Sequence, residues 1–333
     1  YNATDGANWT NRTNWRNVGD TDFNDPGTEN TWFGVTCDAG NTMVTELDLS
    51  GNNLTGSIPT ELEDLSNMQV LFLHTNQLSG SIPSQLGSLM NLEYLYLLYN
   101  NLTGSIPSEL GNLSNLEYLS LGFNNLTGNI PTELGSLPIL LGLGLYSNQL
   151  TGNIPTELGS LLTLEWLRLE SNQLSGNIPT ELGNLSSLFM LRLESNQLNG
   201  KIPTQLGGLS ALETLRLSGN QLCGNIPTSL ASLPNLVSTD IGYNALWTDD
   251  PTLQALLNAE DPDWDQTQTI APADIAAGSE TSSSFVVSWT PILYIADDGW
   301  YEIAIPGEIF SDGFETGDTT LWGAPAPTSP GYF

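Results

Sequence analysis

Residues 92–115 read LEYLYLLYNNLTGSIPSELGNLSN, and this stretch decides the fold because close variants of it follow one another along the chain. The pattern LxxLxLxxNxLxGxIPxxLxxLxx recurs every 24 residues from Val44 to Asn235, which is 192 residues or eight copies, and a ninth copy decays after Leu236. One copy cannot bury its own leucines, so neighbouring copies must stack on one another. The sequence therefore predicts a repeat array with a continuous core.

Each copy is expected to form one short strand and a return. In LEYLYL, alternation places Leu92, Leu95 and Leu97 on the inner side, as a short strand requires. Tyr94 and Tyr96 then point outward. We expect the Gly and the Ile-Pro of GSIP or GNIP to turn the chain and to prevent it from pairing as a strand there, whereas LGxL forms the convex return.

An asparagine occupies the same place in every copy, directly after the strand. The turn there leaves backbone groups facing the interior, and a buried Asn amide can donate to and accept from neighbouring repeats. We therefore expect a structural ladder rather than a ligand site at these positions. The ladder consists of Asn52, Asn76, Asn100, Asn124, Asn148, Asn172, Asn196, Asn220 and Asn244.

The stretch NLTGSIPSELGNLSNLEYL (Asn101 to Leu119) resembles the plant-type class of leucine-rich repeats, which is found in plant receptor ectodomains, polygalacturonase inhibitors and bacterial surface proteins. The resemblance covers roughly 200 residues of the sequence. It implies an α/β-type repeat solenoid, a right-handed superhelix with a parallel concave β-sheet. A small C-terminal β segment is expected after the solenoid.

The two ends resemble other elements of secreted proteins. YNATDGANWTNRTNW and WFGVTCD are similar to the amino-terminal cap of these repeat proteins, where aromatic residues shield the open edge of the first repeat. SFVVSW and WYEIAI look like part of a fibronectin type III domain, but only three or four strands fit before Pro306. Such a fragment must pack on the last repeat or be completed by another chain.

The residues from Ile309 to Pro325 resemble a short motif that recurs at the carboxyl end of secreted bacterial proteins. Together these features predict an N-terminal cap at 1–43, eight repeats at 44–235, a degenerate ninth repeat that forms a C-terminal cap at 236–261, a partial fibronectin-like β segment at 262–308 and an acidic tail motif at 309–333.

The charge balance restricts the partners. The chain has 37 acidic and 6 basic residues and a net charge of −31, which repels nucleic acid and anionic membranes. No stretch approaches the roughly 20 apolar residues of a membrane helix, so we expect no membrane span. The chain opens at Tyr1 without Met or a signal sequence, which predicts a mature or trimmed chain. We expect an extracellular protein that is secreted or held at the cell surface.

Two cysteines stand far apart in the array. Seven repeats would separate Cys37 from Cys223 by roughly 30 Å at the spacing of parallel strands, which excludes an intrachain disulfide. For Cys223, which replaces a Thr or Ser of the repeat, we expect a buried and inert thiol, with pairing between chains as the alternative.

One segment has part of the spacing of a calcium loop. Asp20, Asp22 and Asn24 lie two residues apart, but Asp25 and Thr31 stand where such a loop needs Gly and Glu. We therefore favour a solvated turn over a calcium site and expect no other cofactor.

Outward aromatic residues gather in the first half of the array. Because in-register strands are adjacent, these rings can stack on one another at about 5 Å, or they can form a platform for sugar rings or an extended polypeptide. The predicted stripe consists of Phe72, Tyr94, Tyr96, Tyr99, Tyr118, Phe123, Tyr146 and Trp166.

Arginines follow the aromatic residues. Arg168, Arg192 and Arg216 occupy one repeat position in successive copies, which predicts a ladder. Glu170 and Glu194 lie two residues along on the same face, so the charges either neutralise one another or leave the arginines to clamp carboxylates of a ligand.

The sequence favours recognition over catalysis. His74 is the only histidine, no serine nucleophile motif surrounds it, and neither cysteine has a histidine nearby in sequence. We therefore predict an extracellular protein, not an enzyme, that binds a polysaccharide or a protein on its concave face. The alternative is a structural protein that self-associates through its ends and its incomplete β-sandwich into a surface layer or filament.

Overall fold

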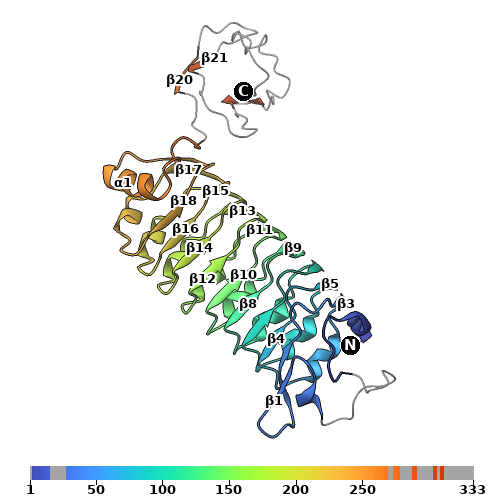
Figure 1. The fold of residues 1–333 in the computed structure, drawn as a ribbon. Coiled ribbons are helices and arrows are strands. Elements are labelled where there is room, and N and C mark those ends of the chain that lie inside the picture. Colours follow the sequence, from blue (N-terminus) through green and yellow to red (C-terminus); the bar gives the residue numbers. More distant parts are fainter. Residues whose placement is uncertain are drawn as a thin grey trace.

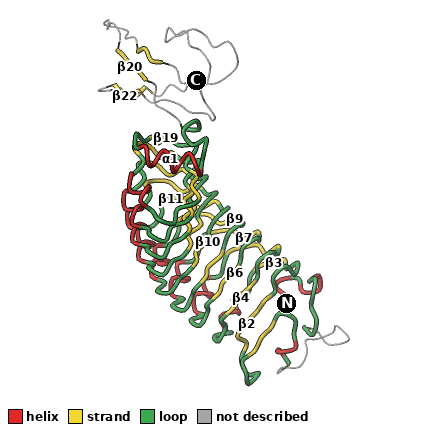
Figure 2. Tube along the Cα trace, turned by 60° about the vertical axis from the view of Figure 1, so that its left-hand side comes forward, coloured by secondary structure: helices red, strands yellow, loops and turns green. Residues whose placement is uncertain are grey.

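The protein is an elongated stack of coils (Figure 1). The computed structural model describes residues 2–15 and 28–268, and after them the backbone of four short strands. Every coil contributes one strand to a wide sheet and most contribute a second strand to a sheet beside it. Figure 2 shows the helical returns stacked along another side of the array.

The wide sheet has ten strands in the order β1-β2-β4-β6-β8-β10-β12-β14-β16-β18. All neighbours are parallel except β1, which pairs antiparallel with β2. Residues 24 apart face each other, as in the pair of Tyr94 with Tyr118, so equivalent positions of successive repeats form columns. The strands are β1 Val35–Cys37, β2 Val44–Asp48, β4 Val70–Phe72, β6 Tyr94–Tyr96, β8 Tyr118–Ser120, β10 Gly142–Gly144, β12 Trp166–Arg168, β14 Met190–Arg192, β16 Thr214–Arg216 and β18 Ser238–Asp240.

A second parallel sheet, which we call the lateral sheet, forms where we expected only a turn. The expectation that Gly and Ile-Pro prevent pairing was wrong, because strands β3 to β17 include the glycine and end before the Ile-Pro. Gly104 shows how this is done, since its φ of 77° bends the strand in a conformation that favours glycine. The strands are β3 Thr55–Ser57, β5 Gln77–Ser81, β7 Asn101–Gly104, β9 Asn125–Asn129, β11 Gln149–Asn153, β13 Gln173–Asn177, β15 Gln197–Gly200, β17 Gln221–Asn225 and β19 Ala245–Trp247.

The returns are short 3-10 helices that begin directly after the proline of each repeat. Their close stacking explains the LG pair, because a Cβ on Gly87 would lie 2.3 Å from the backbone oxygen of Glu109 in the next repeat. These helices are η4 Thr60–Asp64, η5 Ser84–Ser88, η6 Ser108–Asn112, η7 Thr132–Ser136, η8 Thr156–Ser160, η9 Thr180–Asn184, η10 Thr204–Gly208 and η11 Thr228–Ser232.

The core is a continuous column of leucines and isoleucines. Leu92, Leu95 and Leu97 are fully buried, as the alternation in LEYLYL predicted, and the equivalent residues of the next repeats pack against them. No single repeat encloses this column, so stacking provides the hydrophobic burial that stabilises the fold.

Side-chain amides connect the coils at the predicted asparagines. The Nδ2 of Asn100 donates to the oxygen of Leu97 at 3.1 Å and to the oxygen of Leu73, in the preceding repeat, at 2.9 Å. Its Oδ1 accepts from the backbone N–H of Leu78 at 2.9 Å. The same three bonds recur from Asn76 to Asn244. Each amide thus satisfies buried backbone groups of two repeats.

The N-terminal end of the core is closed by aromatic side chains. The ring centroids of Trp9 and Trp15 are 5.0 Å apart, and those of Trp15 and Trp32 are 5.1 Å apart. Asn52, the first amide of the ladder, bonds to this end of the chain, because its Nδ2 donates to the backbone oxygen of Asn11 at 2.7 Å. Three short 3-10 helices belong to this end, η1 Asn2–Thr4, η2 Gly6–Asn8 and η3 Glu29–Thr31.

The C-terminal end is closed by helix α1 (Pro251–Glu260) and the residues after it. Asp250 caps α1 by accepting from the N–H groups of Thr252 and Leu253, both at 2.9 Å. Gln268 stands 24 residues after Asn244 and acts as one more rung, accepting from Leu246 N–H at 2.9 Å and donating to the oxygen of Ile241 at 3.0 Å. The capping contacts therefore continue to Gln268, beyond the boundary at 261 expected from sequence.

Four strands follow the capped array as two antiparallel pairs. β20 (Ala273–Ala277) pairs with β21 (Val287–Thr290), and β22 (Ile303–Ile305) pairs with β23 (Glu308–Phe310). β22 falls within WYEIAI, whereas β21 overlaps SFVVSW and extends one residue beyond it. The fibronectin-like resemblance and the tail motif stay predictions, as does assembly through this segment. The calcium-loop residues Asp20, Asp22 and Asn24 lie outside the described residues.

The ladder leads to a prediction on stability. Asn100→Ala should lower the free energy of unfolding by about 2 kcal/mol, because the N–H of Leu78 loses its side-chain acceptor and the oxygen of Leu73 keeps only its bond from Asn76. Asn101→Ala is the matched control, since this neighbour is exposed and its side chain makes no hydrogen bond within the described part of the chain. Urea denaturation measures both. Equal effects of the two substitutions would contradict the role given to the ladder.

The last rung gives a second prediction. Gln268→Ala should destabilise the C-terminal end by about 2 kcal/mol, because the buried N–H of Leu246 loses its side-chain acceptor. Gln266→Ala, at an exposed glutamine two residues earlier, should have no effect. Amide exchange at Leu246 provides the local readout, and an unchanged exchange rate in the Gln268 variant would contradict the assignment.

Candidate ligand-binding face

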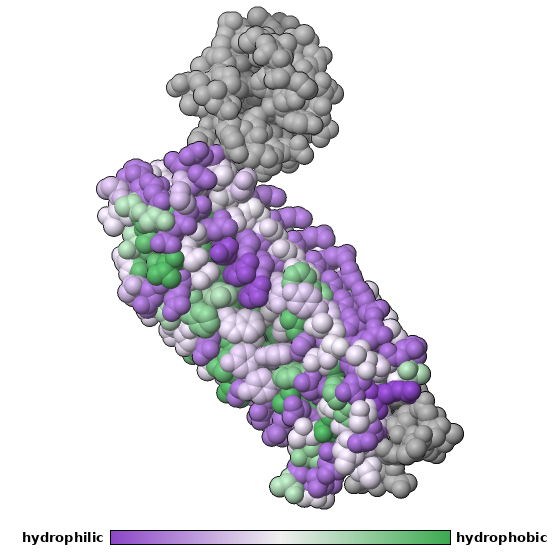
Figure 3. Space-filling model, viewed as in Figure 1, coloured by the Kyte–Doolittle hydropathy of each residue, from purple (hydrophilic) through white to green (hydrophobic). Residues whose placement is uncertain are grey.

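The outward side of the wide sheet, here called the concave face, carries the candidate ligand residues. In Figure 3 the middle of this face is mostly pale, and a deep-purple, hydrophilic group lies closer to the α1 end. Since the strands pair in register, each outward column of the face runs straight across the repeats.

Three rings form a row in the first outward column. The ring centroids of Tyr94 and Tyr118 are 5.5 Å apart with an angle of 12° between their planes. Those of Tyr118 and Trp166 are 6.2 Å apart with an angle of 27°. Neighbouring rings therefore turn their faces toward one another, and we call these three residues the ring row.

A glycine makes the ring row continuous. Gly142 stands between Tyr118 and Trp166 in the column, and a Cβ there would lie 2.1 Å from the Cζ2 of Trp166. The indole occupies the space that a side chain of β10 would fill. Gly122 acts in the same way for Tyr146, whose Cζ would lie 2.6 Å from an added Cβ. We did not single out these glycines from sequence, although glycine at outward strand positions was a visible signal.

The remaining predicted rings pair beside the row. Phe72 stacks on Tyr96 at 4.7 Å and meets Tyr94 edge-on at 6.5 Å. Tyr99 and Phe123 lie on the turn after the strand and stack at 4.3 Å.

Phe123 also meets Tyr146 edge-on at 5.4 Å. The eight predicted rings thus form two clusters, one of Phe72, Tyr94, Tyr96, Tyr118 and Trp166 and one of Tyr99, Phe123 and Tyr146. Tyr99 and Phe123 are 48% and 42% exposed, so part of the second cluster is open to a partner.

Three tyrosines of the face have a raised pKa. The hydrogen bond from Tyr94 to Glu117, at 3.0 Å, raises the pKa of Tyr94. Burial raises the pKa of Tyr96 and of Tyr118. A raised pKa keeps the proton on a tyrosine, so these rings offer apolar surface and hydroxyl groups near neutral pH.

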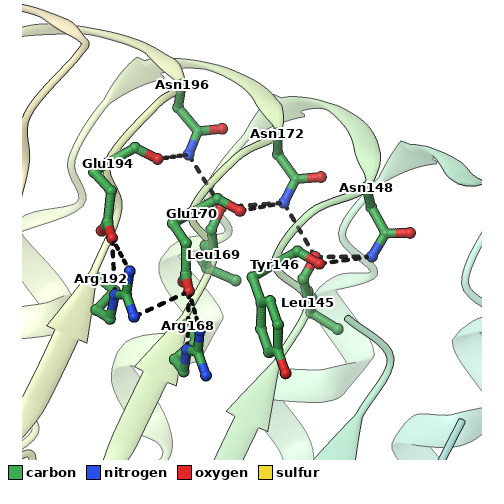
Figure 4. A network of polar contacts seen from close by, with 10 residues as sticks. All are labelled: Leu145, Tyr146, Asn148, Arg168, Leu169, Glu170, Asn172, Arg192, Glu194 and Asn196. Atoms are coloured by element: carbon green, nitrogen blue, oxygen red, sulfur yellow. Dashed lines mark hydrogen bonds and ion pairs between the residues drawn. The ribbon is translucent and has the colours of Figure 1, made fainter. Parts of the chain in front are cut away.

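The arginines continue the face after Tyr146 (Figure 4). The guanidinium of Arg168 lies 3.8 Å from the ring centroid of Tyr146, and its Nε donates to Glu170 at 2.9 Å. The Nε of Arg192 donates to Glu194 at 2.8 Å, and its Nη1 lies 3.6 Å from Glu170. We call Arg168, Glu170, Arg192 and Glu194 the arginine–glutamate network.

Both glutamates of the network are buried, Glu170 to 3% exposure and Glu194 to 9%. The pKa of Arg192 is raised, because the hydrogen bond to Glu194 and the charge of Glu170 outweigh the opposing effect of burial. From sequence, the glutamates could either neutralise the arginines or leave them to clamp carboxylates of a ligand. For Arg168 and Arg192, the structure shows neutralisation.

Arg216 differs from the other two arginines. The residue two places along is Ser218 rather than Glu, and Arg216 forms no ion pair with any residue that the structure describes. Its strand neighbour on the far side is Asp240 at the equivalent position. Among the described residues, Arg216 is therefore the one of the three arginines that has no carboxylate partner.

Other reactive groups are dispersed. His74 lies beside the first cluster, 6.0 Å from the ring of Phe72, and burial lowers its pKa. Within residues 2–15 and 28–268, no three His, Cys, Asp or Glu side chains gather closely enough to hold a metal ion. Across the same residues no helix is long and apolar enough to cross a membrane.

The expectation of a buried Cys223 was wrong. Its side chain is exposed, because the position belongs to the outward side of lateral strand β17 rather than to an interior turn. Cys37 and Cys223 are both free thiols.

The network predicts that two arginines differ in their contribution to stability. Arg192→Gln should destabilise the fold by about 3 kcal/mol, because Glu194 keeps its buried charge and loses its cation. Arg216→Gln should change stability by less than about 0.5 kcal/mol. Thermal denaturation of both variants distinguishes them, and a destabilised Arg216 variant beside a stable Arg192 variant would refute this assignment.

Comparisons with known proteins agree with the architecture. Family models described as leucine-rich repeat match residues 163–222 and residues 43–65, 67–89, 91–113 and 115–137. No curated protein sequence matches the chain significantly.

The solved structures similar to this chain include plant receptor ectodomains. The HAESA ectodomain of Arabidopsis, solved with an N-terminally extended IDA peptide hormone, is 35% identical with a TM-score of 0.59, over 68% of this chain and 39% of that one. The GASSHO1/SCHENGEN3 ectodomain of Arabidopsis thaliana, solved with CASPARIAN STRIP INTEGRITY FACTOR 2, is 36% identical with a TM-score of 0.53, over 69% and 33%. The chain thus spans between a third and two fifths of these two receptor chains.

The repeat period, the parallel sheet with 3-10 returns, the family models and these structures agree: the chain is a leucine-rich-repeat solenoid whose repeats are of the plant-receptor-ectodomain type.

Proposed function

We propose that the concave face binds an extended polypeptide outside the cell. The observation that carries this proposal is the continuous ring row, which crosses β6, β8, β10 and β12 because Gly142 makes room for Trp166. A row of rings across strands provides a long, narrow apolar contact. An extended chain matches that shape, and aromatic anchors of this kind dominate protein interfaces.

The way the rings stack favours a polypeptide over a sugar. A sugar ring needs the open face of an aromatic ring, whereas Tyr94 and Tyr118 turn their faces to one another at 12°. Their edges and hydroxyl groups remain for a partner. Peptide side chains and backbone groups can use such edges and hydroxyls, so polysaccharide binding at the ring row is the less favoured alternative.

The charges beside the ring row indicate which polypeptide fits. Glu93, Glu117 and Glu165 directly precede the three ring-row residues, so they stand at one repeat position beside the row, with Leu141 between Glu117 and Glu165. Toward the C-terminal end Arg216 supplies a cation. The complementary ligand has apolar and basic side chains over β6 to β12 and an acidic group near β16.

The similar structures support the proposal without establishing it. Those described above were solved as ectodomains in complex with a peptide hormone or with a named protein factor. This chain spans a minor share of each of those chains, so the ligand class, the extracellular location and the absence of catalysis are parts of the proposal.

The test begins with short random-sequence peptides displayed on phage and selected on the full chain. Tyr118→Ala should weaken a selected peptide about 30-fold, the equivalent of about 2 kcal/mol for an aromatic anchor. Thr127→Ala is the matched control. Thr127 is exposed on lateral strand β9, away from the ring row, so this substitution should leave binding unchanged. Fluorescence anisotropy measures both affinities.

Two results would refute the proposal. One is a selection that yields no peptide with saturable binding. The other is a selected peptide that binds the Tyr118 variant as tightly as the parent, while circular dichroism shows that both variants are folded.

A further inference from the structure

A cavity of about 630 Å³ lies at the C-terminal end, away from the concave face. Its lining includes residues of lateral strands β17 and β19, of α1 and of the segment that ends at Gln268. This volume falls within the range of about 300–1,000 Å³ that is usual for small-molecule sites. The capping role of Gln268 does not account for a space of this size.

One wall of the cavity is an open aromatic side chain. Trp247 is 54% exposed at the end of β19, and it stacks on no other ring among the residues the structure describes. This distinguishes it from the ring row, whose members cover one another. The cavity therefore contains the feature that the concave face lacks, an indole with uncovered surface.

Two side-chain amides of the lining each use one polar atom in a hydrogen bond within the protein and leave the other available. The Nε2 of Gln254 donates to the oxygen of Thr248 at 2.9 Å, which leaves its Oε1 as an acceptor. The Oδ1 of Asn258 accepts from the Nε1 of Trp264 at 2.9 Å, which leaves its Nδ2 as a donor. Gln254 and Asn258 are one turn apart on α1, so both are fixed on the same side of a capped helix.

An acidic side chain completes the lining. Asp265 is exposed and lines the cavity, and its carboxylate makes no hydrogen bond within the described part of the chain. The cavity thus offers two acceptors, the Asp265 carboxylate and the Gln254 Oε1, and one donor, the Asn258 Nδ2. Surrounding residues Asp249, Asp250 and Asp263 add negative charge, which disfavours an anionic ligand.

We propose that this cavity binds one glycosyl unit of an uncharged carbohydrate. The C–H face of the sugar packs on Trp247, sugar hydroxyls donate to Gln254 Oε1 and Asp265, and Asn258 Nδ2 donates to a sugar oxygen. The alternation of donors and acceptors around an aromatic surface matches a ring of hydroxyl groups, each of which both donates and accepts. The site is independent of the polypeptide proposed for the concave face.

Cys223 provides a reporter for occupancy, because its exposed thiol lines the same cavity. The probes are cellotriose, maltotriose and laminaritriose, titrated into the full chain by calorimetry. A bound trisaccharide should slow the modification of Cys223 by a maleimide about 10-fold or more, whereas Cys37, at the other end of the array, reacts at an unchanged rate.

Variants identify the residues that bind. Trp247→Ala should weaken the trisaccharide at least about 10-fold, since the stacking contact is lost. Asp265→Asn keeps the shape and should weaken it several-fold. Tyr243→Ala is the matched control, because it removes another exposed aromatic side chain of the same repeat, 46% exposed, and should have no effect.

Each contrary result overturns the proposal. No heat of binding from any of the three sugars would do so, as would binding that Trp247→Ala leaves unchanged. A Cys223 that does not react in the unliganded full chain would show that the cavity is covered by the protein itself. Trp247-dependent binding of choline without binding of sugar would assign the cavity to a cation instead.

Discussion

Every coil of this protein depends on one buried side-chain amide. Each ladder asparagine joins three segments: its own turn, the strand of the preceding repeat and the start of the preceding lateral strand, as Asn100 does through Leu97, Leu73 and Leu78. The leucines supply the hydrophobic free energy, but they are nondirectional and would tolerate some rotation between repeats. The amide is directional, since its donors and acceptor fit one arrangement of the coils.

The fixed arrangement of the coils creates the concave face. Because each repeat stands in the same register as the last, outward residues 24 apart are neighbours, and a ring in one copy meets a ring in the next. The same register places Arg168 beside Arg192, and their like charges are tolerated because Glu170 contacts both. Recognition surfaces of this kind are set by the choice of outward residues, while the inward residues keep the scaffold constant.

Sequence reasoning succeeded where a feature repeats and failed where the period weakens. The period of 24 located the wide sheet and the ladder, because each Asn repeats the same local problem of unsatisfied backbone groups. It missed the lateral sheet, since Gly and Ile-Pro were interpreted as strand breakers, whereas the positive φ of Gly104 bends a strand that still pairs. It also missed Gln268, whose only signal was its distance of 24 from Asn244 in an otherwise altered segment.

At the site, sequence located the columns but not the contacts within them. Whether Arg192 was free or neutralised depended on the orientation of Glu170 and Glu194, which spacing alone does not fix. The role of Gly142 depended on the direction in which Trp166 leans, which is also a property of packing. The ion pairs of Arg192 and the position of Trp166 over Gly142 determine which groups of this face a ligand can contact. The proposed specificity therefore rests on the structure more than on the repeat pattern of the sequence.

Amide hydrogen exchange of the full chain tests the account most directly. The backbone N–H groups that bond to the ladder belong to Leu54, Leu78, Leu102, Leu126, Leu150, Leu174, Leu198, Leu222 and Leu246. If the amide ladder fixes the coils as one body, the interior members of this set exchange among the slowest amides of the chain and do so together, through a common unfolding reaction. Fast or unrelated exchange rates at these leucines, in a chain that is otherwise folded, would contradict the account.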